Sequence, residues 1–299
     1  MLNPSFSKAM QRCITTPYVA PPEIANRIVA GNEAFDTGGV EHRLQDIFGE
    51  EIWLKLERAS LSPEVFQGAD VLEVCAGTGF LTYHLLQRCR PQHLTVNDIS
   101  ATELSLARQF IGRTYPDAPV NWVLGDMHTV DFGRQFDVII GNSFVHHFHD
   151  VPKVLARFAG MLKLGGVFIS LHEPTPMSTV VEGAKVAVWP LAVLAPGFVN
   201  DIARARFKGQ ASSTDLWMFE AEKIKQVARQ AGFTKVGALP WGLLRAIVTQ
   251  RHGLHLSDSK PSLSPDEERR FLRAIRTDAL LNRFLPQRCF GSICLICRR

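Results

Sequence analysis

The sequence contains few cysteines and no hydrophobic run long enough to cross a membrane. Cysteine accounts for six of the 299 residues, and no cationic, apolar leader is visible. The longest apolar stretch, residues 186–199, is shorter than the roughly 20 residues of a membrane-spanning helix and is interrupted by Pro190 and Pro196. We therefore expect neither a disulfide-dependent secreted protein nor a transmembrane segment, and we expect a cytoplasmic location.

Net charge is also low. The chain carries 33 Lys and Arg residues against 29 Asp and Glu residues, a net charge of +4. It has no Lys/Arg-rich arm, although duplex binding depends on neutralising phosphates with such residues. Nucleic acid is therefore not an expected partner. With 46% hydrophobic residues and no repeat or low-complexity tract, the composition is typical of a folded protein with a substantial core.

The middle of the chain alternates between short apolar runs and segments with helical periodicity. This alternation predicts an α/β fold with a doubly wound, mostly parallel sheet. Strands are predicted at residues 69–77, 93–100, 120–126, 136–142 and 165–173, and helices at residues 80–89, 101–115 and 150–163.

The flanking regions predict additions to this sheet. A helix at residues 218–233, a strand after it and an antiparallel strand near residues 291–298 would complete seven strands. Ser264 before Pro265 is a plausible N-cap for a helix over residues 265–284. We interpret the chain as one elaborated domain, residues 68–299, behind an N-terminal helical cap. The divisions are the cap at 1–67, a lid at 174–215 and a helical insertion at 241–288.

The most informative motif lies where the first predicted strand meets a helix. It reads Glu73-Val-Cys-Ala-Gly77-Thr-Gly79, and two glycines let the backbone turn tightly and approach a ligand. The second strand ends about twenty residues later at Asp98, where a carboxylate can bind ribose hydroxyls. The third ends at Asp126, which offers an acceptor for an exocyclic amine. Together these positions predict a site for a nucleoside-containing cofactor.

On these motifs the chain resembles the class I S-adenosylmethionine-dependent methyltransferases. The resemblance covers residues 70–173 and includes the E-x-x-x-G-x-G loop, the ribose-binding acid and the pair at the adenine edge. It implies a Rossmann-like fold, S-adenosylmethionine as cofactor and methyl transfer as the activity. The cofactor-binding residues expected from it are Glu73, Cys75, Ala76, Gly77, Gly79, Asp98, Ile99, Asp126, Met127 and Asn142.

Three alternatives concern the cofactor and its use. A dinucleotide-binding dehydrogenase would have glycine where this chain has Thr82, so that class is not favoured. An enzyme of the same fold that cyclises the cofactor and releases methylthioadenosine remains the runner-up. A non-catalytic cofactor-binding protein is the third alternative, because a complete pocket does not prove turnover.

Groups that orient a nucleophile or remove its proton are expected beyond the carboxyl ends of the strands. We hypothesise that His147 or His172 is the general base or orients the acceptor; the alternative is that each histidine only packs or forms hydrogen bonds. No metal site is expected, since Cys294 and Cys297 have no second cysteine pair nearby. Cys75 is interpreted as a small buried side chain.

The expected acceptor is a small or medium organic molecule, free or carrier-bound, methylated on oxygen or nitrogen. The segment after the fourth strand is Gly-Asn-Ser-Phe, which differs from the motif of enzymes that methylate base amines. Apolar lid residues, with Trp217 and Phe219, could form an acceptor wall or pack on the cap. The arginines of residues 265–284 could form a solvated face, or dock an acidic carrier protein or an anionic membrane. The lid residues of that wall are Val186, Val188, Trp189, Leu191, Leu194 and Phe198.

Overall fold

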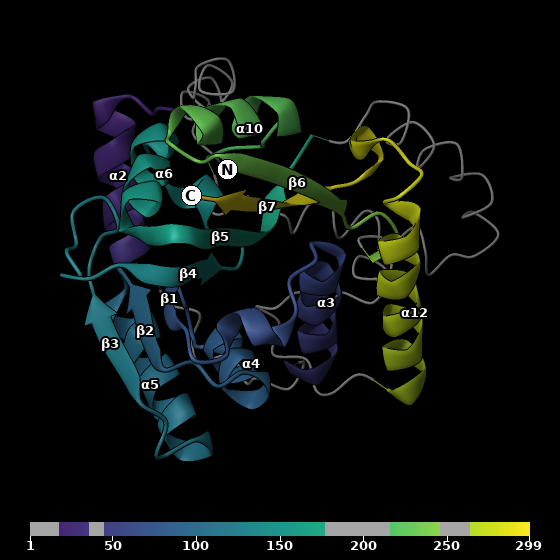
Figure 1. The fold of residues 1–299 in the computed structure, drawn as a ribbon, viewed down its shortest axis with the longest axis horizontal. Helices are drawn as coiled ribbons and strands as arrows, with labels where there is room; N and C mark the ends of the chain where they lie inside the picture. Colours follow the sequence, from purple (N-terminus) through teal and green to yellow (C-terminus); the bar gives the residue numbers. More distant parts are fainter. Residues whose placement is uncertain (1–17, 36–44, 177–215, 246–263) are drawn as a thin grey trace.

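A seven-stranded sheet organises the molecule (Figure 1). The computed structural model describes residues 18–35, 45–176, 216–245 and 264–299. Across the sheet the strand order is β3-β2-β1-β4-β5-β7-β6. The strands are β1 (Asp70–Val74), β2 (His93–Asp98), β3 (Val120–Leu124), β4 (Phe136–Gly141), β5 (Leu162–Pro174), β6 (Lys235–Trp241) and β7 (Ser292–Arg298).

The first five strands are parallel, and all except the edge strand β3 have side chains buried on both faces. In β1, Val71 belongs to one apolar cluster while Leu72 and Val74 belong to the other. This division follows from the alternation of side chains along a strand. It explains why these segments are almost continuously apolar, as parallel strands covered on both sides are.

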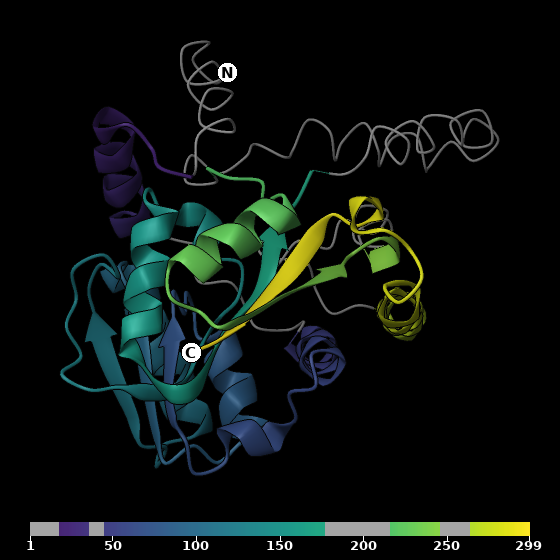
Figure 2. The same ribbon diagram turned by 45° about the horizontal axis from the view of Figure 1, so that its top comes forward.

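Helices cover both faces of the sheet, as the turned view in Figure 2 shows. One layer packs on the cluster that contains Val71 and the other on the cluster that contains Leu72. The first layer is α3 (Gln45–Arg58), α4 (Phe80–Arg88) and α5 (Ala101–Thr114), and the second is α2 (Pro22–Glu33), α6 (Val151–Met161) and α10 (Ala221–Gln230). Short 3-10 turns are η1 (Pro63–Phe66), η2 (Val145–His147) and η3 (Gln287–Cys289).

The C-terminal strand confirms the predicted antiparallel closure. β7 pairs antiparallel with β5 on one side and with β6 on the other. The expected Rossmann-like class, mostly parallel with an antiparallel C-terminal strand, is therefore correct. β7 therefore lies between β5 and β6, two strands that precede it in the chain.

α12 (Pro265–Leu281) packs beside α3 at the end of β6 (Figure 1). Phe271, Ile275 and Ala279 on its inner side pack with Trp241. The predicted N-cap is present: the Ser264 hydroxyl accepts from the Glu267 N–H, and the Glu267 carboxylate accepts from the Ser264 N–H. Such a capping box satisfies two donors at the helix start.

Several predicted features lie wholly or partly outside the described residues. The lid at 174–215 is described only through residue 176, so its proposed apolar wall is not described. Parts of the cap at 1–67 and of the insertion at 241–288 are likewise not described. Within the described ranges, no helix is both long and apolar enough to cross a membrane.

Candidate active site

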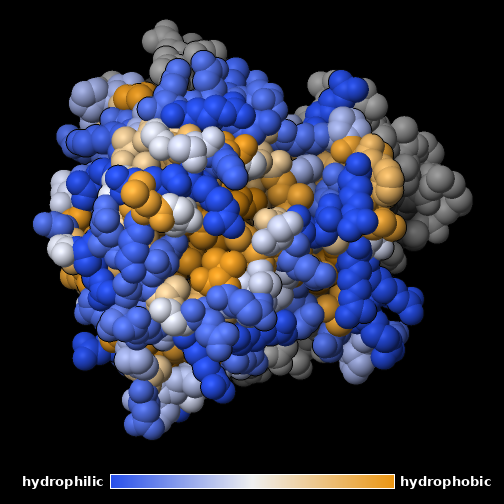
Figure 3. Space-filling view, in the orientation of Figure 1, coloured by the Kyte–Doolittle hydropathy of each residue, from blue (hydrophilic) through white to orange (hydrophobic). Residues whose placement is uncertain are grey.

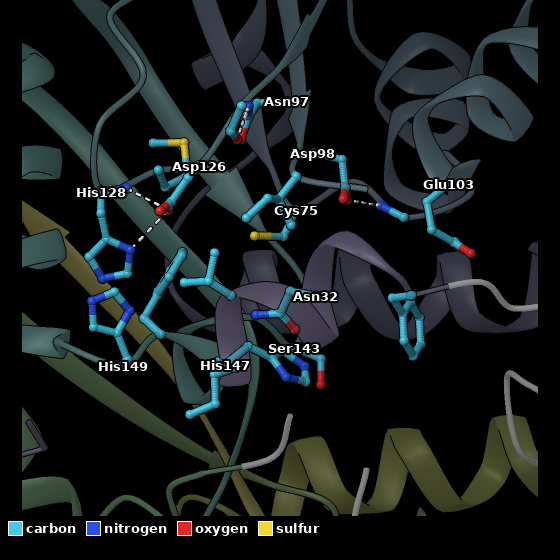
Figure 4. Close-up of a pocket in the computed structure, with 18 residues that line it drawn as sticks. Asn32, Cys75, Asn97, Asp98, Glu103, Asp126, His128, Ser143, His147 and His149 are labelled. Atoms are coloured by element: carbon cyan, nitrogen blue, oxygen red, sulfur yellow. Dashed lines mark hydrogen bonds and ion pairs between the residues drawn. The ribbon is translucent and has the colours of Figure 1, made fainter. Parts of the chain in front are cut away.

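A cavity opens where β1, β2, β3 and β4 end, and α2 forms its opposite wall (Figure 4). Eighteen residues of the described ranges line it. They are Ile28, Val29, Asn32, Phe35, Cys75, Gly77, Asn97, Asp98, Ile99, Glu103, Gly125, Asp126, Met127, His128, Ser143, His147, Phe148 and His149. Carboxyl ends of parallel strands at a point of topological reversal are where open α/β sheets bind ligands.

The turn after β1 has a backbone that few residues adopt. Gly77 has φ +53° and Cys75, a non-glycine, has φ +52°. Ser143 after β4 has φ +59° and also lines the cavity. A left-handed residue other than glycine costs about 1–2 kcal/mol, so such strain is concentrated where geometry is functionally constrained. Burial and nearby carboxylates raise the pKa of the Cys75 thiol, which keeps it neutral.

Asp98 links three segments around the cavity. Its Oδ2 atom accepts from the Gly77 N–H at 2.8 Å, and Oδ1 accepts from the Ser100 N–H at 2.8 Å. The Ser100 hydroxyl in turn donates to the Phe35 carbonyl at 2.7 Å. This chain of bonds connects the glycine turn, the start of α5 and the segment after α2. Burial raises the pKa of Asp98, although these backbone donors oppose the shift.

A second carboxylate, Asp126, is held by His128, on which His149 stacks. His128 Nδ1 lies 2.9 Å from Asp126 Oδ1, and the His128 N–H donates to the same oxygen at 2.9 Å. The His128 ring stacks on His149 with centroids 3.9 Å apart (Figure 4). Burial opposes ionisation of Asp126, but the hydrogen bonds from His128 outweigh it and lower the pKa of Asp126. Burial and the neighbouring His128 lower the pKa of His149.

Hydrogen bonds to Glu173 fix the loop after β4. This carboxylate accepts from the backbone N–H groups of Phe144, Val145 and His146, and His146 Nδ1 lies 2.7 Å away. Burial would raise the pKa of Glu173, but His146 and the hydrogen bonds lower it. The result is a fixed loop that presents Ser143 and His147 to the cavity (Figure 4).

His172 does not line the cavity. It lies on β5 near α3, where Glu51 forms ion pairs with Lys55 at 3.0 Å and with Arg245 at 3.2 Å. Burial, followed by the charges of Lys55 and Arg245, lowers the pKa of His172 well below its ordinary value. His172 is therefore a neutral ring beside a buried ionic cluster, while His147 is the candidate histidine that the cavity contains.

The structure brings six of the ten predicted cofactor residues to the cavity. These are Cys75, Gly77, Asp98, Ile99, Asp126 and Met127. Glu73, Ala76, Gly79 and Asn142 do not line it. Glu73 is fully buried and accepts from the Thr82 hydroxyl at 2.7 Å. A Cβ at Gly79 would lie 3.1 Å from Ala107 Cβ, so this glycine permits close packing of α4 on α5.

Other lining residues had no expected role in the sequence. The α2 residues Ile28, Val29 and Asn32 line the cavity, yet helical periodicity does not reveal which part of the molecule a helix covers. Glu103 lies in the first turn of α5 behind Gly77, and its Oε2 atom would be 3.7 Å from a Cβ at that glycine. The N-cap of α5 is Ser100, three residues before Glu103, and this helix-start signal is visible in the sequence.

The charge of the cavity wall is distinctive. Asp98, Glu103 and Asp126 are carboxylic acids, and none of the eighteen described lining residues is lysine or arginine. Such a wall favours a ligand with positive charge and offers no cation to a pyrophosphate. The lining thus agrees with the sequence in not favouring a dinucleotide.

The remaining chemical candidates are structural in this fold. Trp217 and Phe219 are buried and pack edge-on against Tyr18, whose ring centroid lies 5.7 Å from that of Trp217 and 4.9 Å from that of Phe219. Of the two roles expected for these residues, this is packing on the cap. Cys294 and Cys297 are buried in β7 as free thiols. Burial raises the pKa of Cys294 to about 12. Among the described residues, no group of three or more His, Cys, Asp and Glu side chains could hold a metal ion.

Known proteins resemble this chain in sequence and fold. A family model described as a methyltransferase domain matches residues 71–166. Malonyl-[acyl-carrier protein] O-methyltransferase of Haemophilus ducreyi is 36% identical over 106 residues, which cover 36% of this chain and only 40% of that protein. The 2-phytyl-1,4-naphtoquinone methyltransferase of Thermosynechococcus vestitus is 30% identical over 198 residues, covering 63% of this chain and 83% of that protein. A solved phosphoethanolamine N-methyltransferase 2 of Haemonchus contortus has a TM-score of 0.55 at 15% identity, over 92% of this chain and 59% of that one, and shows the fold alone.

Proposed function

The chain belongs to the class I S-adenosylmethionine-dependent methyltransferases, and from this premise we propose that it methylates a small or medium organic acceptor on oxygen or nitrogen. The single observation that carries the proposal is the acidic cavity at the strand ends. Its carboxylates and its positive-φ turn after β1 fit a nucleoside that bears a positive charge.

The donor set fits S-adenosylmethionine part by part. Asp98, which ends β2 and lines the cavity, would accept hydrogen bonds from ribose hydroxyls. Asp126 is kept ionised by His128, which suits it to accept from the adenine amine. Gly77 and Glu103 lie together on the side where the charged end of the cofactor would be held. When bound, S-adenosylmethionine supplies a methyl group on a positively charged sulfur.

The chain's own contribution to transfer would be orientation, exclusion of water and proton removal. Ser143 and His147 lie on the loop that Glu173 fixes, so they are suited to orient an acceptor. An imidazole can also take the acceptor proton. Ile28, Val29 and Phe35 cover the cavity with apolar surface, which limits the access of water.

Two relatives indicate what an acceptor of this type can be. One is named for a malonyl group on an acyl carrier protein and the other for a phytyl-naphthoquinone. We propose a carrier-bound acceptor for this chain, with a free small molecule as the alternative. The relatives are methyltransferases and give no support to cyclisation of the cofactor.

Product analysis tests the proposal directly. The protein is incubated with S-adenosylmethionine alone, with malonyl-acyl carrier protein and with a free quinol. S-adenosylhomocysteine that forms only when an acceptor is present is the expected result. Methylthioadenosine without an acceptor would establish cyclisation instead. Tight cofactor binding with neither product would favour a non-catalytic protein.

A single-turnover comparison separates the two histidines. His147→Gln should slow transfer at saturating acceptor, because the cavity contains this ring. His172→Gln should leave the transfer rate close to wild type, because its ring lies beside the ionic cluster. Full activity of the first variant would remove His147 from the reaction.

A further inference from the structure

The outward side of α12 combines arginine with large apolar residues. Arg273, Arg276 and Leu280 follow each other at intervals of three and four, so they share one side of the helix. The opposite side, which includes Phe271 and Ile275, is buried. Over 17 residues the helix is about 25 Å long, which makes its outer side an extended ridge.

The positive charge of this ridge is not neutralised. Within the described ranges, Arg273, Arg276 and Arg283 form no ion pair. Burial and the charge of Arg283 lower the pKa of neighbouring Arg58, whose buried Nε atom has no acceptor among the described residues. Arg58 also donates to Asn282 at 2.9 Å, which places it at the same end of α12. The C-terminal end of α12 therefore has more guanidinium groups than acidic partners among the described residues.

Apolar side chains project from the end of the same ridge. Leu280 is 53% exposed and Phe284 is 74% exposed. In Figure 3 the outer surface of α12 is largely hydrophilic, with hydrophobic residues gathered at its upper end. A protruding aromatic residue beside arginines is the composition of a protein interface, where such residues carry most of the binding energy.

The distribution of charge along α12 selects the type of partner. Its first turn exposes Asp266 and Glu268, and Asp266 pairs with Arg269. An anionic bilayer would meet these acids together with the arginines and would be repelled at one end. A protein surface can place its acids opposite Arg273 and Arg276 only, and can offer a socket to Phe284.

We infer that the α12 surface, defined as Arg273, Arg276, Leu280, Arg283 and Phe284, docks the acidic helical face of a small carrier protein that bears the acceptor. The statement that this carrier protein bears the methyl acceptor rests on the proposed function. The docking itself is a binding event that needs neither cofactor nor turnover.

The test measures binding of the full chain to fluorescently labelled acyl carrier protein at low ionic strength. Arg273→Glu/Arg276→Glu should weaken binding about tenfold or more, and Phe284→Ser should weaken it independently. Arg108→Glu/Arg113→Glu on α5 makes the same change in net charge at other exposed positions and is the matched control. Added salt should weaken wild-type binding.

Each other outcome overturns the inference. Absence of wild-type binding, or equal loss in the control variant, would remove the docking site. Binding to phosphatidylglycerol vesicles but not to the carrier would identify a lipid surface. A change of oligomeric state in Arg273→Glu/Arg276→Glu would identify a second copy of this chain. Unchanged S-adenosylmethionine affinity in the variant shows that it folds, so failure of docking and failure of methyl transfer are distinguishable.

Discussion

Asp98 is both a predicted ribose ligand and the acceptor that holds the glycine turn. Asp98→Asn replaces one of its two accepting oxygens with a donor, which cannot accept from the Gly77 or the Ser100 N–H. We expect S-adenosylmethionine affinity to fall about 10- to 100-fold, because hydrogen bonds to a charged group are lost. Calorimetric titration measures the affinity. Asp117→Asn, at an exposed position, is the control and should bind normally.

His128 controls the charge of Asp126. His128→Phe keeps a ring against His149 but removes the donors of its side chain. Because burial then acts on Asp126 with less opposition, the pKa of Asp126 should rise. The ionised form is the one suited to the cofactor, so binding should be lost at a higher pH in the variant than in wild type. Titrations of cofactor affinity from pH 4 to 7 would contradict this if both curves coincided.

Sequence reasoning identified the acids at strand ends but not the residues that tune them. Asp98 ends the buried strand β2 and Asp126 follows the edge strand β3, and the carboxyl ends of parallel strands meet at one edge of the sheet. His149 stacks on His128 from a loop 21 residues further along the chain, and no periodicity encodes that contact. His172 shows the converse: it lies near the carboxyl end of β5, where a site residue is expected, yet it is outside the cavity lining and the charges of Lys55 and Arg245 act on it.

At the scale of elements, α3 carries a buried ionic cluster. Burial alone would raise the pKa of Glu51, but Arg245 and Lys55 lower it from 4.5 to about 2. The unfolded chain therefore takes up this proton at higher pH than the folded one. The stability that Glu51 contributes is present above pH 4.5 and is lost as the pH falls toward 2.

Glu51→Gln should lower the free energy of unfolding by about 3–5 kcal/mol at neutral pH, because two cations lose their buried partner. It should also flatten the loss of stability below pH 4.5. Urea denaturation between pH 3 and 7 measures both effects. Glu57→Gln on the same helix changes an exposed side chain and should do neither.

Elements were predictable where a local signal marks their ends. The N-caps Ser100 and Ser264 and the left-handed Gly232 after α10 lie where the sequence indicated helix boundaries. The elements against which each helix packs were harder to predict from the sequence. α2 and α3 were predicted together as one cap, but α2 covers the cavity while α3 packs on the opposite face of the sheet. An amphipathic pattern identifies a buried side without identifying its partner.

At the scale of the whole molecule, the central and edge strands of the sheet should differ in how much stability is lost when an apolar side chain is truncated. Leu295 in β7 is fully buried between two strands, while Leu124 in edge strand β3 is 55% exposed. Leu295→Ala should therefore cost about 2–5 kcal/mol of stability. Leu124→Ala should change it by about 0.5 kcal/mol or less. Thermal unfolding of both variants provides the comparison, and equal shifts would contradict it.

All seven strands could be predicted from apolar periodicity, but their lateral order could not. Nothing local in residues 292–298 indicates that this strand enters between β5 and β6. Pairing is decided by which arrangement buries the apolar faces of the central strands, a property of the assembled sheet.

The position of β7 has a consequence for how the protein is made. A ribosome synthesises β6 before the strand that separates it from β5. The nascent chain can assemble the four strands that frame the cavity early, yet β6 pairs within the described sheet only with β7, which emerges later. During that interval β5 and β6 expose unpaired edges, and this is when chaperones would be most needed by the growing polypeptide.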